Sequence, residues 1–185
     1  MTDKQNNPMK FAAWFVALFV VFYYGNIFFF GLTSPGKYYS PFLANHLNYI
    51  QGLRWVLLKC SAFILNSLGY TTVTNNYDLL VAGHGVIRLV YSCLGLGVIS
   101  FFTAFVLAYP KPTKAKVIFI AAGILAIELL NIIRFVLLAL FWTRADNEVV
   151  DHHTIFNMLM YVIIGISLYF WVKADIAPKK QHAAN

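Results

Sequence analysis

FAAWFVALFVVFYYGNIFFFGL, residues 11–32, contains no charged side chain and is long enough to cross a membrane. About 20 mostly apolar residues are needed to span the ~30 Å hydrocarbon core of a bilayer as a helix. The whole chain has 185 residues, of which 60% are hydrophobic and only 11% charged, and this composition excludes an ordinary soluble domain. Since backbone polar groups in lipid must be satisfied internally, such runs predict an all-α membrane protein.

Further apolar runs extend this prediction to a polytopic membrane helix bundle that forms one domain over residues 1–185. We predict four transmembrane helices, at residues 11–32, 92–109, 117–142 and 154–172. Within the first of them, the Gly25-Asn26 pair interrupts the aromatic run, and we expect it to pack against a neighbouring helix.

Residues 42–69 differ from these spans because polar residues recur along them at helical spacing. Asn48, Lys59 and Asn66 belong to this polar stripe, and the clean apolar piece is too short to span. This pattern favours an amphipathic helix in the membrane interface, with a fifth span as the alternative. Residues 70–91 are rich in Thr, Val and Tyr, with a Gly-His-Gly break, and predict a small extracytoplasmic β-hairpin-like loop.

The distribution of basic residues predicts the orientation of the spans. The loop at 110–116, the C-terminal tail and the N-terminal tail carry most of the lysines and should be cytoplasmic. Residues 33–91 and 143–153 then lie outside. The net charge of +7 is therefore interpreted as a topology signal of a multi-pass inner (cytoplasmic) membrane protein and not as a nucleic-acid surface.

Cys93 lies in the stretch RLVYSCLGLG, residues 88–97, where the outer loop meets the 92–109 span. The positive end of a helix dipole lowers a thiol pKa and favours the reactive thiolate, and Gly95 leaves space beside it. The alternative is that Cys93 is a small buried apolar residue. We interpret Cys60, the second cysteine, as structural, and the sequence leaves open a disulfide between the two.

Arg134 lies deep in the apolar run 117–142. A charge inside a span costs at least ~2.5–3.5 kcal/mol and is by default a functional-site hypothesis. Arg134 is roughly 12 Å below the outer end of the helix, at 1.5 Å per residue, within reach of the surface for a long side chain. Asn131, one turn earlier, is expected to hold the guanidinium. A structural pair between Arg134 and Glu128 is the alternative.

Two histidines, His152 and His153, begin the last span, and Asn157 follows His153 by one turn. Histidine is the usual general acid or base near neutral pH. The alternative is a pair of exposed interfacial histidines. In the outer loop, His84 and Arg88 flank the cysteine and either contact substrate or are simply solvated. A thiol, an imidazole and a guanidinium in the same outer leaflet are a suitable set for acyl transfer.

The segments SCLGLG, NIIR and HHTIFN, in this order near the ends of successive spans, resemble the Cys, Arg and His motifs of the exosortase/archaeosortase family. The resemblance covers roughly residues 40–172, and the chain is similar to compact bacterial members. It departs from the family at Leu94-Gly95, where Ser-Gly is common, and at Asn157, where Gly is common.

The resemblance implies a membrane cysteine protease and transpeptidase that cleaves the C-terminal sorting signal of exported proteins. Cys93 would be the nucleophile, Arg134 the oxyanion stabiliser and His153 the acid/base, preferred over His152 because Asn157 follows it by four residues. The implied partners are exported proteins with a C-terminal motif, membrane helix and basic tail, the lipid bilayer, and a cell-surface acceptor. No cofactor, metal or nucleic acid is expected. The alternative function is a non-enzymatic membrane subunit of a transporter or polysaccharide-export system.

Overall fold

The computed structural model describes residues 8–36, 38–141 and 152–174. The chain forms two units, Met1–Asp146 and Asn147–Asn185. The first unit holds five α-helices, a 3₁₀ turn and three strands in its described part: α1 (Pro8–Thr33), α2 (Pro41–His46), α3 (Tyr49–Ser67), β1 (Thr72–Thr74), β2 (Asp78–Val81), β3 (Gly85–Arg88), η1 (Tyr91–Leu94), α4 (Leu96–Ala108) and α5 (Thr113–Phe141). The second unit holds α6 (His152–Lys173).

The protein is mostly helical, as the composition predicted, with apolar helices over all four predicted spans. In the described ranges, α1 with 26 residues and α5 with 29 are long and apolar enough to cross a membrane. The α4 helix has 13 residues, which is about 20 Å at 1.5 Å per residue and shorter than a hydrocarbon core. Residues Met158–Lys173 of α6 form another shorter apolar helix. Four membrane crossings therefore remain a prediction.

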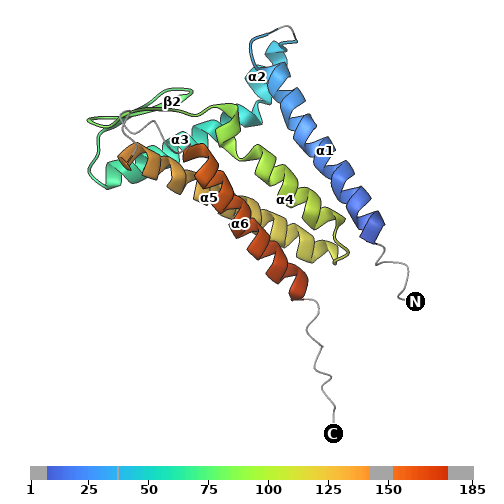
Figure 1. Ribbon diagram of the computed structural model, residues 1–185. Helices are drawn as coiled ribbons and strands as arrows, with labels where there is room; N and C mark the ends of the chain where they lie inside the picture. Colours follow the sequence, from blue (N-terminus) through green and yellow to red (C-terminus); the bar gives the residue numbers. More distant parts are fainter. Residues whose placement is uncertain (1–7, 37, 142–151, 175–185) are drawn as a thin grey trace. The chain divides into compact units, whose positions relative to one another are not determined.

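In the first unit, α4 lies between α1 and α5 (Figure 1). Aromatic side chains join α1 to α4, where Phe15 contacts Phe101 and Phe105 edge to face at centroid distances of 5.3 and 5.9 Å. On the other side of α4, the ring of Phe102 occupies the space that a side chain at Gly123 of α5 would need. Small residues let helices approach closely in membranes, where packing replaces the hydrophobic effect between helices.

A polar contact also ties α1 to α4. Asn26 donates a hydrogen bond from Nδ2 to Oγ of Ser100 at 3.0 Å, and Ser100 donates to the carbonyl of Leu96 at 2.7 Å. The hydroxyl group of Tyr49 in α3 donates a hydrogen bond to Oδ1 of Asn26. The expected contact between the Gly25-Asn26 pair and a neighbouring helix is confirmed at Asn26. These bonds fix the end of α1 against the beginning of α3 and α4.

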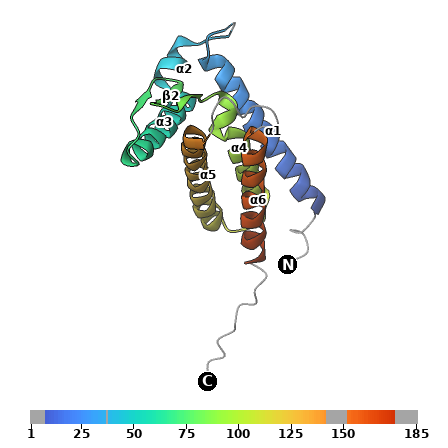
Figure 2. The same ribbon diagram turned by 60° about the vertical axis from the view of Figure 1, so that its left-hand side comes forward.

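The segment 42–69 is divided into α2 and α3, and the break falls at Asn48. The side chain of Asn48 accepts a hydrogen bond from the backbone N–H of Gln51 at 3.0 Å, which caps the start of α3. One face of α3 is buried and packs on α5. The polar stripe contacts the sheet instead. Lys59 donates a hydrogen bond to the hydroxyl of Thr74 at 2.9 Å, and the hydroxyl of Thr72 donates to Oδ1 of Asn66 at 2.9 Å. Figure 2 shows β2 beside α3.

The loop at 70–91 is a three-stranded antiparallel sheet in the order β1-β2-β3, and not the single hairpin that was predicted. The difference arises at Asn75, whose side chain accepts from the backbone N–H groups of Tyr77 and Asp78 at 2.7 and 2.6 Å. Such an Asx turn reverses the chain between β1 and β2. The second reversal uses Gly83 and Gly85, both at positive φ, where the Gly-His-Gly break was noted.

Candidate functional site

Cys93 lies in the 3₁₀ turn η1, three residues before Leu96, where α4 begins. Its backbone N–H donates to the carbonyl of Val90 at 3.0 Å, and its side chain is buried, with 5% of the residue exposed. Gly95 ends this turn and begins α4 with φ of +69°, a left-handed conformation that favours glycine. The sequence suggested that Cys93 would lie in the first turn of the helix. The structure places it in a tight turn before the helix.

Asn131 of α5 lies directly against Gly95. A Cβ atom added at Gly95 would be 2.6 Å from Nδ2 of Asn131, so only glycine lets the turn approach α5 this closely. The same Nδ2 atom donates to Oε2 of Glu128 at 3.3 Å. Asn131 is buried and therefore joins the cysteine turn to the polar positions of α5. The sequence predicted that Asn131 would hold the guanidinium of Arg134. The side-chain hydrogen bond that the structure describes for Asn131 is to Glu128.

Arg134 is buried, with 3% of the residue exposed, in the last turns of α5. It lies seven residues before Phe141, where the described helix ends, which is roughly 10 Å along the axis at 1.5 Å per residue. Its positive charge acts on the thiol of Cys93, whose pKa it lowers. The fold therefore places Cys93 within range of the charge of Arg134.

The pKa of the Cys93 thiol is nevertheless raised above its ordinary value. Burial of the thiol is the largest cause, and the charge of Arg134 and hydrogen bonds with Val90 and Ser92 oppose it. The sequence had suggested a lowered pKa from a helix N-terminus. Since Cys93 is buried in the turn before α4, desolvation of the thiolate outweighs the charge of Arg134 and these hydrogen bonds. A buried thiol of this kind needs a base, or a substrate-bound state, to become a thiolate.

We expect Arg134→Gln to raise the pKa of Cys93 further, because the substitution removes the positive charge that favours the thiolate. Alkylation by iodoacetamide should then shift to more alkaline pH and become several-fold slower at neutral pH, since the thiolate is the nucleophile. The measurement is the pH profile of Cys93 alkylation by mass spectrometry in a Cys60→Ser background. Arg134→Lys retains the charge and is the matched control. The same profile in Arg134→Gln and the parent protein would contradict this role.

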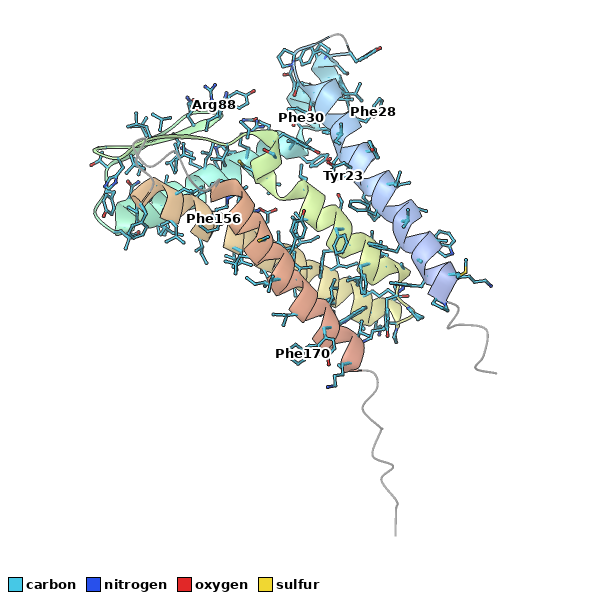
Figure 3. All side chains as sticks on the ribbon, in the orientation of Figure 1. Tyr23, Phe28, Phe30, Arg88, Phe156 and Phe170 are labelled. Atoms are coloured by element: carbon cyan, nitrogen blue, oxygen red, sulfur yellow. The ribbon has the colours of Figure 1, made fainter. Side chains whose placement is uncertain are left out.

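Tyr91 of the same turn stacks on Phe30 of α1, with ring centroids 4.6 Å apart. Burial raises the pKa of Tyr91 to about 12, so its hydroxyl stays protonated at neutral pH and is no candidate base. Tyr23 of α1 lies 3.4 Å from the position of a Cβ on Gly97, in the first turn of α4. Figure 3 shows Tyr23 and Phe30 on the side of α1 that faces this turn and Phe28 directed away.

His84 and Arg88 lie on the sheet. Arg88 donates to both carboxylate oxygens of Asp78, at 2.8 and 3.3 Å, and the two residues are direct partners in the β2–β3 register. These bonds, and a further one from Asn75, hold the pKa of Asp78 below its ordinary value. His84 is half-buried in the β2–β3 turn and contacts the ring of Tyr70 edge to face at 5.2 Å. Both residues have local structural partners, and their contact with substrate remains a prediction.

The histidine segment begins α6 in the second unit. His152, His153 and Asn157 fall within its first two turns, and their side chains lie outside the described residues. The choice between the two histidines therefore remains a prediction from the sequence. Within the described parts of the chain, no group of three His, Cys, Asp or Glu side chains is placed to hold a metal ion. No disulfide joins Cys60 and Cys93.

Arg54 is a buried charged residue that sequence reasoning missed. It lies on the buried face of α3, with 4% of the residue exposed, and donates from Nη1 to Oε1 of Gln51. Its guanidinium lies over the ring of Tyr77, 4.6 Å from the centroid. The available signal was an arginine within the apolar side of an amphipathic helix, between Ile50 and Leu57. Arg54 was missed because the polar residues of this helix were all interpreted as part of an amphipathic polar stripe.

Comparison with protein-family models agrees with a membrane protein. A family model described as transmembrane exosortase matches residues 8–170 of the chain. No curated protein and no solved structure matches. The matched range includes the cysteine turn, the buried arginine of α5 and the histidines of α6.

Proposed function

Because the chain belongs to the transmembrane exosortase family, we propose that it is a membrane cysteine transpeptidase or protease that removes the C-terminal sorting signal of exported proteins. The observation that carries this proposal is the placement of the Cys93 turn against the buried half of α5, where the charge of Arg134 acts on the thiol. A positive charge within range of a thiol favours the thiolate and can stabilise an oxyanion, whereas a purely structural cysteine has no need of such a charge.

The proposed chemistry has two steps. His153 takes the proton of the Cys93 thiol, the resulting thiolate attacks the scissile carbonyl carbon, and Arg134 stabilises the oxyanion that develops. The C–N bond then breaks, His153 gives a proton to the departing amine, and a thioester with Cys93 remains. In the second step an acceptor nucleophile or water gives its proton to His153 and attacks the thioester carbonyl, which releases the thiolate. His152 and Asn157 would support the imidazole from the same helix.

The substrates would be exported proteins that end in a short motif, a membrane helix and a basic tail. Such a tail is held at the cytoplasmic face by its charge, which presents the motif at the outer face. The site would accordingly face the extracytoplasmic side of the inner membrane, with both termini of this chain in the cytoplasm. The exposed β-sheet, with His84 and Arg88, would lie beside the arriving polypeptide.

The test is co-expression of this chain, in a host that lacks such an enzyme, with an exported protein of this kind from the same genome. We expect loss of a C-terminal epitope tag from the exported protein only when the chain is present. Hydroxylamine should convert the thioester to a C-terminal hydroxamate on the cleaved protein, which mass spectrometry detects. Equal processing with and without the chain would overturn the proposal and favour a non-enzymatic subunit. Chain-dependent cleavage that never yields the hydroxamate would overturn the proposed thioester.

A further inference from the structure

A cavity of about 70 Å³ lies where α1 ends and α3 begins. Its lining comes from three parts of the first unit, namely the end of α1, the first turns of α3, and the turn between β1 and β2: Phe30, Thr33, Ser34, Asn48, Ile50, Gln51, Arg54 and Tyr77. A water molecule needs about 10–15 Å³ of such volume, so the cavity can hold one group of several non-hydrogen atoms. It cannot hold a folded peptide segment or an acyl chain.

Arg54 gives this cavity its charge. The side chain is buried, its Nε atom has no hydrogen-bond partner, and its two contacts, Gln51 and the Tyr77 ring, are neutral. Among the eight residues that line the cavity, none is acidic. A buried cation without a counter-charge is costly, and a bound anion would remove that cost.

The remaining polar groups of the lining suit an oxyanion. Ser34 and Tyr77 carry hydroxyl groups, and Asn48 carries an amide whose oxygen is already used to cap α3. The positive end of the α3 dipole lies at the same point, because Asn48 is the N-cap and Tyr49 the first residue of that helix. Arginine with hydroxyl donors and a helix N-terminus is a typical phosphate-binding arrangement.

The position of the cavity indicates where the phosphate comes from. Thr33, the last residue of the long apolar helix α1, lines the cavity, so the cavity lies where that helix would leave the hydrocarbon. Two exposed tyrosines lie just after this helix end and at the start of α3: Tyr39 and Tyr49. Aromatic residues of this kind gather at the depth of lipid headgroups.

We propose that the Arg54 cavity binds the phosphate of a membrane-lipid headgroup. This site is separate from Cys93 and independent of the proposed acyl transfer. The acyl chains of the lipid would lie outside the cavity, along the exposed aromatic side chains. Phe30 lines the cavity and stacks on Tyr91, two residues before Cys93, so a bound headgroup would also stabilise the α1 side of the cysteine turn.

The test measures the melting temperature of the full-length protein in a neutral detergent, followed by tryptophan fluorescence. Added phosphatidylglycerol should raise the melting temperature by about 4–8 °C at saturation, whereas diacylglycerol with the same acyl chains and no phosphate should not. Arg54→Gln should abolish the rise. Lys59→Gln removes an exposed cation from the same helix and should keep it. Ser34→Leu, which fills the cavity and leaves Arg54 in place, should also abolish the rise.

The proposal fails if phosphatidylglycerol raises the melting temperature equally in the parent protein, Arg54→Gln and Ser34→Leu, or if it has no effect on the parent protein. Inorganic phosphate is the third addition. An equal rise with inorganic phosphate would overturn the assignment to a lipid and identify a soluble anion as the ligand. The assay contains no sorting substrate and can be repeated with Cys93→Ala, so its outcome is separate from that of the transpeptidase proposal.

Discussion

Replacement of Cys93 by Ala or Ser is expected to abolish removal of the sorting signal, with processing reduced by at least about 10⁴-fold. Alanine removes the nucleophile, and serine keeps its size but presents a hydroxyl that is a far weaker nucleophile at neutral pH. The measurement is the fraction of an exported reporter that retains its C-terminal tag. Because the residue is buried, alanine leaves a small cavity and serine buries a hydroxyl group, so processing is compared at equal levels of folded protein.

Cys60→Ser is the matched control for this experiment. Cys60 is the second cysteine of the chain, lies half-buried on α3, and has no place in the proposed chemistry. Processing by Cys60→Ser should equal that of the parent protein. Normal processing by both Cys93 variants, at equal protein levels, would refute a nucleophilic role for this thiol and return it to the class of small core residues.

Gly95→Ala should produce the second-largest effect, on both stability and processing. A non-glycine residue in the left-handed conformation costs roughly 1–2 kcal/mol. The new Cβ would also lie 2.6 Å from Nδ2 of Asn131, so either the cysteine turn or the buried amide must shift. We expect a lower melting temperature and a processing defect larger than the stability loss alone explains, because the displaced turn carries Cys93.

Gly97→Ala is the control for Gly95→Ala, because it adds the same methyl group two residues further along the chain. Gly97 lies within α4, and its added Cβ would meet the ring of Tyr23 at 3.4 Å, an ordinary contact distance. Gly95→Ala combined with Asn131→Ala should recover part of the lost stability, since the contact is relieved and the backbone conformation is not. If Gly95→Ala were as stable and as active as Gly97→Ala, the proposed coupling of the turn to α5 would be wrong.

Much of the architecture follows from composition and periodicity, because a membrane imposes strong constraints on sequence. The long apolar runs predicted the helices α1 and α5, since mostly apolar stretches of this length are typical of membrane-spanning helices. Arg134 could be selected from the sequence alone, because a charge in an apolar run is costly wherever the run is placed. The Gly-His-Gly break predicted one reversal of the chain, whereas the reversal at Asn75, which adds a third strand, was not predicted.

The sequence by itself determined the membrane character of this protein, its helical segments and the residue types available for chemistry. Only the tertiary structure placed the cysteine turn against Asn131 and within the influence of Arg134, because that juxtaposition depends on how α4 packs on α5. The same is true of Arg54, whose burial arises when α1, α3 and the turn between β1 and β2 meet around it. Local sequence fixes which groups a helix carries, whereas desolvation and charge interaction depend on neighbours that are distant in the chain.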